Sequence, residues 1–351
     1  MIKKAATGNQ GEKKAVTPGG FQIRNLVKLD GDLIRLLLLT VAIFVAMSLL
    51  KPDLFLTLRN FSSMSFQFPE YGILAIAIML TMLTGGIDLS AVGIANLSAI
   101  FAALTLTGLI PQGTTGGNLV LAMSLAIFFS VITGIICGFI NGLLIAKIGI
   151  TPILATLGTM QLFTGIAIVV TKGTAIYGFP DQFSFIGNGS LWFLPMPLII
   201  FAVIVFLFYI ILNKSAFGFE VNLLGTNPTA SHFSGINNTL TLIRTYVLSG
   251  LLASMAGIIM IARTNSAKAD YGTSYTLQAI LIAVLGGVNP NGGFGTIAGL
   301  VLAIFSLQFL SSGFNMLRFS NFSKEFIWGA VLLGVMVVNY FSNRRRSRAD
   351  R

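Results

Sequence analysis

The hydrophobic residues of this chain occur in long continuous runs that no charged residue interrupts. Residues 71–87 and 89–146 contain no Asp, Glu, Lys or Arg, and Asp88 alone stands between them. In a soluble fold such runs would expose a large apolar area, which costs about 25 cal/mol per Å². Residues 198–212 are apolar on every side, whereas the strands of a membrane barrel alternate in hydrophobicity over segments of about 10 residues. The pattern therefore predicts an all-α integral membrane protein.

Ten runs are candidate transmembrane helices, separated by charged or turn-forming residues. A helix needs about 20 apolar residues to cross a hydrocarbon core of about 30 Å. The predicted spans are Leu36–Leu50, Tyr71–Thr84, Ala91–Ile110, Leu119–Ala146, Pro152–Val170, Leu191–Leu212, Thr245–Ala262, Tyr275–Val288, Thr296–Phe314 and Phe326–Phe341. Where no charge divides neighbouring spans, Pro and Gly clusters at 111–117 and 289–293 indicate turns. We therefore expect about ten spans, of which the second and eighth are short.

The positions of Lys and Arg predict the orientation of the bundle, because basic residues are retained on the cytoplasmic side. Seven of the 22 basic residues lie in the first 35 residues and five in the last eight. Both termini are therefore expected in the cytoplasm, which requires an even number of spans. Ten spans place 15 basic residues inside, including Lys147, Lys214 and Arg244, against seven outside.

The composition agrees with a membrane protein. Hydrophobic residues make up 55% of the 351 residues and charged residues 9%, with a mean hydropathy of +0.87, outside the usual soluble range. The net charge of +11 does not indicate nucleic acid, because 12 of the 22 basic residues lie in two tails where anionic lipid explains them. We expect a disordered cytoplasmic arm at 1–32 without a cleavable signal sequence, a transmembrane domain at 33–343 and a basic cytoplasmic tail at 344–351.

Residues that carry catalysis or metal binding are sparse. Cys137 is the only cysteine and lies in an apolar span, and His232 is the only histidine and lies in a predicted loop. One His without paired carboxylates cannot build a hydrolytic or metal site. No Gly-Lys-Ser/Thr sequence occurs, so the chain has no phosphate-binding loop of that type. We expect neither enzymatic activity nor a cofactor in this chain.

Asp88 is the one acid that the predicted spans place inside the bundle. A carboxylate there is costly unless it is paired, hydrogen-bonded or wetted. One interpretation is a cap of the third span, in which Asp88 accepts from the backbone N–H of Ser90 or Ala91; the other is a contact with a transported solute. A proton relay would need a second interior acid, and the predicted spans offer none.

Two glycine pairs favour helix breaks. Gly85-Gly86 and Gly286-Gly287 follow apolar runs, with no strand before them and no catalytic Lys after them, so breaks and close helix packing are favoured over a nucleotide cradle. Residues 83–88 and 284–289 resemble each other, which hints at an internal duplication.

The longest predicted interior loop covers residues 213–244, on the cytoplasmic side. Asn227 and Pro228 are placed to begin a short helix of about two turns. Such a semi-apolar helix suits docking into a groove on another protein, and an amphipathic connector that lies on lipid has the same pattern.

Short motifs occur in sequence between about residues 70 and 300. They are Gly85-Gly-Ile-Asp-Leu-Ser90, Asn141-Gly142, Thr156-Leu-Gly158, Phe217-Gly218, Gly225, Asn227-Pro228, Ala230, Ser234-Gly-Ile236, Leu277-Gln-Ala-Ile280, Gly286-Gly287, Gly292-Gly-Phe-Gly295 and Gly299. Together in one hydrophobic chain they are specific. On these motifs the chain resembles a permease subunit of the ribose-type branch of bacterial ABC importers for simple sugars.

The resemblance implies a translocation pathway for a ribose-like or other simple sugar in the bacterial cytoplasmic membrane. It also implies a second permease chain, identical or different, cytoplasmic ATPase subunits that hold ATP and Mg²⁺, and an extracytoplasmic sugar-binding protein. Residues 213–244 would then contain the coupling helix, which touches the ATPase. The coupling residues that the resemblance implies are Phe217, Gly218, Gly225, Asn227, Pro228, Ala230, His232 and Gly235. Phe219, His232 and Gln278 depart from the family pattern and indicate a divergent branch.

A sugar pathway should be lined by hydroxyl and amide groups. The candidates, with Asp88, are Asn96, Ser98, Asn141, Thr156, Thr159 and Gln278. Each side chain is equally consistent with an interhelical hydrogen bond worth about 0.6 to 2 kcal/mol.

Three alternatives stay open at this point. A permease of the same branch for a nucleoside or another small polar solute would carry the same motifs. An ion-coupled secondary carrier would have a similar bundle but coupling acids in midmembrane. A membrane-embedded enzyme would need a nucleophile, metal ligands or paired acids in its interior.

Overall fold

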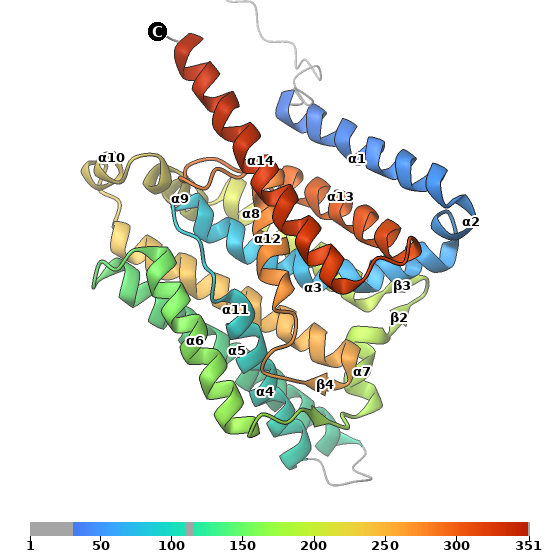
Figure 1. The fold of residues 1–351 in the computed structure, drawn as a ribbon. Helices are drawn as coiled ribbons and strands as arrows, with labels where there is room; N and C mark the ends of the chain where they lie inside the picture. The colour runs from blue at the N-terminus through green and yellow to red at the C-terminus, as the bar shows by residue number, and fades with distance from the viewer. Residues whose placement is uncertain (1–30, 110–115, 350–351) are drawn as a thin grey trace, which may run out of the picture.

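The computed structural model describes residues 31–109 and 116–349, which form a helical bundle with two very small sheets (Figure 1). The helices are α1 (Gly31–Leu50), α2 (Pro52–Phe55), α3 (Leu58–Leu83), α4 (Ala91–Leu109), α5 (Gly117–Ala146), α6 (Pro152–Thr171), α7 (Asp181–Asn188), α8 (Met196–Lys214), α9 (Ala216–Thr226), α10 (Pro228–Phe233), α11 (Asn238–Thr264), α12 (Ser274–Leu285), α13 (Ile297–Met316) and α14 (Asn321–Ala349). The strands are β1 (Ile176–Tyr177), β2 (Ser190–Leu191), β3 (Leu194–Pro195) and β4 (Ser266–Ala267).

The predicted fold class is confirmed, since each of the ten predicted spans overlaps one helix, although the sixth was expected to begin at Leu191, which lies in the β2–β3 hairpin ahead of α8 at Met196. Within the described residues, eight helices are long and apolar enough to cross a membrane: α1, α3, α4, α5, α6, α8, α11 and α13. The predicted eighth span is α12, whose 12 residues extend about 18 Å and fall short of a bilayer core. The predicted tenth span lies within α14.

Some predicted boundaries were wrong. The second span was expected to begin at Tyr71, but α3 begins at Leu58, where Thr57 accepts a hydrogen bond from the backbone of Asn60 at 3.2 Å. This polar first half of α3 was taken for a loop because it carries Arg59 and several Ser and Gln residues. The predicted arm at 1–32 lies almost wholly outside the described residues, as do 110–115 and the last two residues of the predicted tail.

Helix α11 lies at the centre of the bundle, in contact with α3, α4 and α5. Glycines bring these backbones together: a Cβ added at Gly250 would lie 2.1 Å from the carbonyl oxygen of Gly134, and one at Gly138 would lie 2.3 Å from that of Tyr246. Small residues at helix interfaces allow this close approach in membranes, where packing rather than water drives association.

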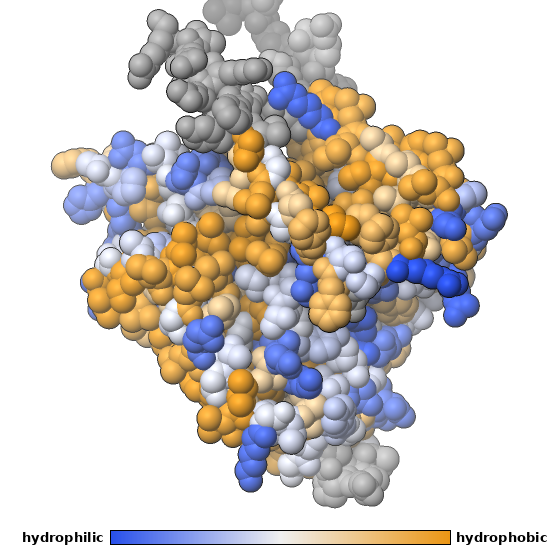
Figure 2. Space-filling model, viewed as in Figure 1, coloured by the Kyte–Doolittle hydropathy of each residue, from blue (hydrophilic) through white to orange (hydrophobic). Residues whose placement is uncertain are grey.

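The two ends of the bundle differ. Helices α9 and α10 lie at one end, at the left of Figure 1, and α2 and the β2–β3 hairpin lie at the other. Near that second end, β1 pairs antiparallel with β4, with Ile176 opposite Ala267, and so joins the segment after α6 to the segment after α11. Figure 2 shows apolar side chains over the flanks of the viewed face and a paler, more polar band between them.

Candidate functional site

The predicted short helix in the 213–244 segment is present as α10, and a second helix, α9, precedes it. Ser215 begins α9 by accepting from the backbone N–H of Gly218 at 3.4 Å. Asn227 ends α9 and begins α10, where its side chain accepts from the N–H of Ala230 at 3.0 Å and Pro228 occupies the first helical position. The Asn-Pro pair therefore does what its chemistry predicts.

Side-chain hydrogen bonds hold α9, α10 and the start of α11 together as one unit, which we call the lever (residues 216–241). The Asn238 amide accepts from the Ser231 hydroxyl and donates to the Pro228 carbonyl, both at 2.8 Å. The Thr241 hydroxyl donates to Glu220 at 3.1 Å. The phenyl ring of Phe233 is 85% exposed on this unit, so an apolar group is presented outward at this end of the bundle.

The lever meets the end of α3 and the segment after α12 through close backbone contacts, beside which the Thr226 hydroxyl lies against Gly293. The N–H of Gly293, in the segment after α12, donates to the carbonyl of Leu83 at the end of α3, at 2.9 Å. A Cβ added at Gly225 of α9 would lie 1.9 Å from that same carbonyl oxygen and 2.5 Å from the Gly293 nitrogen. Only a glycine fits at position 225 without a shift of the backbone. Helix α9 is therefore in direct backbone contact with the end of α3 and with the segment after α12. We call this contact the glycine junction (Leu83, Gly225 and Gly293).

The two helix ends share a local structure, in line with the resemblance of residues 83–88 and 284–289. Each helix closes with a glycine at φ +82°, Gly85 after α3 and Gly287 after α12, the left-handed position that favours glycine at a helix end. Each continues into a turn in which a side chain accepts from the backbone two residues on. Asp88 accepts from Ser90 at 3.0 Å and Asn289 accepts from Asn291 at 3.1 Å.

Asp88 is fully buried at the break between α3 and α4, and the hydrogen bond expected from Ser90 is present. Its carboxylate accepts from the N–H of Ser90, from the Ser90 hydroxyl at 2.6 Å and from the Ser249 hydroxyl of α11 at 2.8 Å. Asn141 of α5 donates to the Ser90 hydroxyl at 2.7 Å. Thr156 of α6 accepts from the N–H of Leu89 at 3.2 Å. Asp88 therefore ties this break to α11, and Ser90 and the Leu89 backbone tie it to α5 and α6.

The other pathway candidates differ in their exposure. Asn96 is buried and donates to the carbonyls of Ala269 and Tyr271, at 3.0 and 2.9 Å, so it holds the segment before α12. Ser98 and Thr159 are also buried. Gln278 is half-buried on α12 and is the one predicted pathway residue with access to the surface of this single chain.

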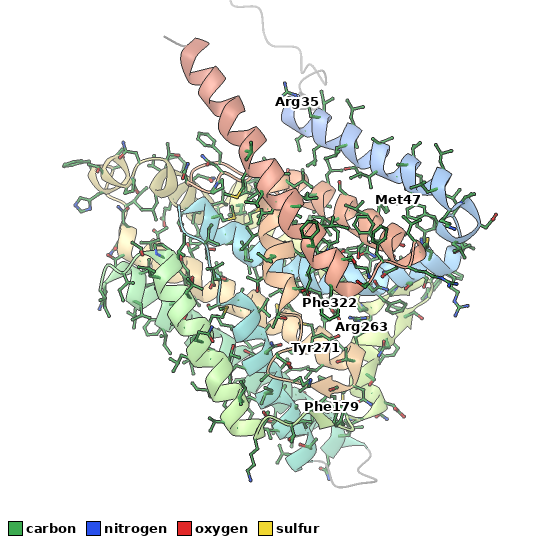
Figure 3. The ribbon with its side chains drawn as sticks, viewed as in Figure 1. Arg35, Met47, Phe179, Arg263, Tyr271 and Phe322 are labelled. Carbon is green, nitrogen blue, oxygen red and sulfur yellow. The ribbon has the colours of Figure 1, made fainter. Side chains whose placement is uncertain are left out.

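The sequence did not predict the buried ion pair between Glu70 and Arg263. Glu70 is fully buried within α3, where the Arg263 guanidinium of α11 contacts both carboxylate oxygens, through Nε and, at 3.0 Å, through Nη2. The Tyr275 hydroxyl of α12 donates to Glu70 at 3.2 Å. Figure 3 labels Arg263 and Tyr271 in this region. The expectation that Asp88 is the only interior acid was wrong, because the late start predicted for the second span placed Glu70 at a span end.

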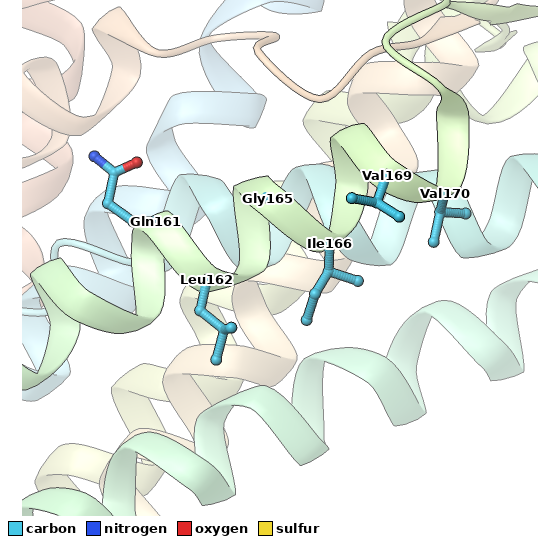
Figure 4. Close-up of a pocket in the computed structure, with 6 residues that line it drawn as sticks. All are labelled: Gln161, Leu162, Gly165, Ile166, Val169 and Val170. Atoms are coloured by element: carbon cyan, nitrogen blue, oxygen red, sulfur yellow. The ribbon is translucent and has the colours of Figure 1, made fainter.

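The outward face of α6 was also missed. Gln161, Leu162, Gly165, Ile166, Val169 and Val170 line a surface groove of about 400 Å³ (Figure 4). Gly158 lies on the same face as Gln161, and a Cβ added at Gly158 or Gly165 would touch nothing within 4 Å. The groove is apolar except for Gln161, and because an exposed amide is costly against lipid, Gln161 favours a neighbour other than lipid at this position.

Residues 60–336 match a family described as "Branched-chain amino acid transport system / permease component". The chain is 34% identical over 280 residues to the "Autoinducer 2 import system permease protein LsrD" of Yersinia enterocolitica serotype O:8 / biotype 1B, covering 78% of this chain and 81% of the relative. It is 33% identical over 293 residues to proteins of the same name from Yersinia pseudotuberculosis strain YPIII and Yersinia pestis strain Pestoides F, covering 79% of this chain and 85% of each relative. No solved structure matches.

Proposed function

Because the chain belongs to this permease family, and within it to the ribose-type branch of ABC importers for sugar-like solutes, we propose that it forms the translocation pathway for a small uncharged sugar or sugar-like polyol. The chain is a multi-pass protein of the bacterial cytoplasmic membrane. The relatives carry the name of an autoinducer-2 import system, and for this chain we propose a small uncharged sugar-like solute, of which ribose is one example.

The glycine junction carries this proposal. A permease moved by external ATPases needs a surface that receives force from them. It also needs a contact that passes this force to the gate, which we define as the helices that open and close the translocation pathway. The lever provides this surface. Gly225 passes the force to the end of α3, at Leu83, and to Gly293 in the segment after α12, with no flexible side chain between Gly225 and these two backbones. Close-packed backbones transmit displacement because interiors are not compressible.

The proposed partners are two cytoplasmic ATPase subunits at the lever, an extracytoplasmic solute-binding protein at the opposite end, and a second permease chain. The outward face of α6, with Gln161 between Gly158 and Gly165, is the surface that we assign to the second chain and to the pathway between the two. Gln278 of α12 supplies a further amide to the pathway. Hydroxyl and amide groups suit a neutral polyol, which needs hydrogen bonds and gains nothing from a fixed charge.

The test is reconstitution in proteoliposomes. The permease alone is expected to be inert, and uptake of labelled sugar is expected only after the ATPase subunits, the binding protein and ATP are added. Uptake driven by a proton or sodium gradient without ATPase subunits would refute the proposal and favour an ion-coupled carrier. In the described structure the two interior acids do not support such a carrier, because Glu70 is neutralised by Arg263 and Asp88 is held by hydroxyl groups.

A further inference from the structure

A polar cavity lies between α3 and α13, toward the end of the bundle opposite the lever. Its volume is about 200 Å³. The polar residues that line it are Asn60, Ser63 and Gln67 of α3, and Gln308, Ser312 and Asn315 of α13. All six side chains are uncharged amides or hydroxyls.

The spacing of these residues explains why they meet. Positions 60, 63 and 67 recur at three and four residues and therefore lie on one face of α3, and positions 308, 312 and 315 do the same on α13. Two hydrogen bonds join the helices across the cavity. The Ser312 hydroxyl donates to Asn60 at 2.8 Å, and the Tyr71 hydroxyl donates to Gln308.

These interhelical bonds do not use all of the polar groups. Among the residues that the structure describes, the side chains of Ser63 and Gln67 bond to each other alone, within one turn of α3, where Gln67 donates to Ser63 at 2.9 Å. A cavity that stays empty is lined by apolar groups, whereas a polar cavity of this size holds water or a polar guest; liquid water occupies about 30 Å³ per molecule, so about six or seven waters would fill it. The space also suits a guest smaller than the drug-sized ligands that occupy about 300 to 1,000 Å³.

None of the residues that line the cavity is charged, which favours a neutral guest. Glu70 lies one turn below Gln67 on α3, and Arg263 neutralises it. At the rim, Lys324 of α14 contacts Asn315. Next to the cavity, Tyr71, whose hydroxyl donates to Gln308, packs its ring against the ring of Tyr275 in the first turn of α12, with 5.9 Å between centroids, so α12 is the neighbour of the helix that lines the cavity.

We propose that this cavity is a loading site for a small uncharged polyol, at which solute first contacts the permease before it moves along α12. The inference rests on the proposed function and adds a binding site with named residues to it. Ser63 and Gln67 supply the hydrogen bonds to the solute, and Gln308, held by the Tyr71 hydroxyl, lines the cavity beside them.

Thiol labelling tests the site directly. Cys137 is the only cysteine and is 4% exposed, so a C137A chain carrying Ser63→Cys offers one target in the cavity. Ser62→Cys is the matched control, because Ser62 is exposed on the same helix, about 100° away, and does not line the cavity. The assembled transporter in right-side-out vesicles is treated with a membrane-impermeant methanethiosulfonate, with D-ribose as the probe and glycine betaine as the osmolyte control.

Ribose is expected to slow the labelling of Ser63→Cys about threefold at a concentration of about twice its dissociation constant, since occupancy divides the rate by 1 + [L]/Kd. It should leave Ser62→Cys unchanged, and betaine should protect neither. Equal labelling of Ser63→Cys with and without ribose overturns the loading site. If C137A does not assemble, the native background serves, because Cys137 is buried.

Failure of the site and failure of the proposed function give different results. If the reconstituted complex imports sugar with ATP but ribose does not protect Ser63→Cys, only the loading site is wrong. If ribose protects Ser63→Cys but ATP drives no uptake, the cavity binds polyols and the importer function is wrong.

Discussion

The glycine junction makes a sharp prediction for the substitution Gly225→Ala. The new Cβ would lie 1.9 Å from the Leu83 carbonyl oxygen and 2.5 Å from the Gly293 nitrogen. Both contacts are with backbone atoms, so no side chain can rotate away to make room. Helix α9 must therefore move away from the end of α3 and from the segment after α12.

The magnitude follows from three effects. Overpacking in a closely packed site costs about 1 to 3 kcal/mol, and weakening the hydrogen bond from Gly293 to Leu83 costs about 1 kcal/mol more. Replacing Gly by Ala within α9 returns about 1 kcal/mol of helix propensity. The net effect is about 1 to 3 kcal/mol, and if it falls on the coupling between the lever and the gate, ATP-driven uptake drops by about 5- to 150-fold.

The assay compares uptake, ATP hydrolysis and thermal unfolding of the reconstituted complex. Gly108→Ala is the matched control, because Gly108 lies in the last turn of α4 and an added Cβ meets nothing within 4 Å. Gly225→Ala is expected to keep hydrolysing ATP while it loses uptake, and Gly108→Ala is expected to match the unmodified protein. Normal uptake by Gly225→Ala at normal expression would refute the reasoning, because it would mean that the lever does not act through this contact.

The remaining predictions concern the two interior acids and the exposed face of the lever. Asp88→Ala removes three hydrogen bonds to a buried carboxylate and should lower the free energy of unfolding by about 3 kcal/mol or more, seen as a lower midpoint in thermal unfolding. Arg263→Ala leaves Glu70 buried and unpaired, at a cost of about 3 to 5 kcal/mol, so it should lower that midpoint more than Glu70→Gln does; the reverse order would contradict the pairing. Phe233→Ala should weaken co-purification of the ATPase subunits by about 30-fold, a loss of about 2 kcal/mol, whereas Phe322→Ala, which removes an 86% exposed ring on α14, should not change it.

The fold was predictable because lipid imposes it. Long apolar runs without charge can be buried in a bilayer as helices, and each of the ten predicted runs overlaps one helix. The Asn227-Pro228 pair predicted the start of α10 for a local reason, since the side chain and the ring act on their own backbone. These features depend on residues that are close in the sequence, so a single sequence is enough to predict them.

The first half of α3 shows why other features were missed. Its residues are polar on one face because that face lines the α3–α13 cavity, and a search for uncharged runs reads such a helix as a loop. Glu70 then appeared to lie at a span end, although its partner Arg263 is nearly 200 residues away in the chain. Pairings of this kind depend on tertiary packing, and neither residue carries a local signal of the other.

The pathway candidates were chosen because they are polar residues in predicted spans. That criterion does not distinguish a side chain that bonds to a neighbouring helix from one that contacts a solute. Asn96 and Asn141 are buried and bond within the chain, whereas Gln161, on the outward face of α6, was not selected. Exposure in the folded chain separates the two groups.

The two helix ends at the glycine junction are not held equally. The break after α3 is fixed to α5, α6 and α11 through Asp88, Ser90 and Thr156. The segment after α12 closes mainly on itself, where the N–H of Asn289 donates to the carbonyl of Phe294 at 2.8 Å. A displacement of the lever is therefore resisted more strongly at α3 than at α12, a helix that is too short to span the bilayer core and is anchored at its other end by the hydrogen bond from Tyr275 to Glu70. Because α12 reaches from the glycine junction at one end to the helix that lines the proposed loading site at the other, we expect the same element to receive the force of the ATPases and to change the access of the solute.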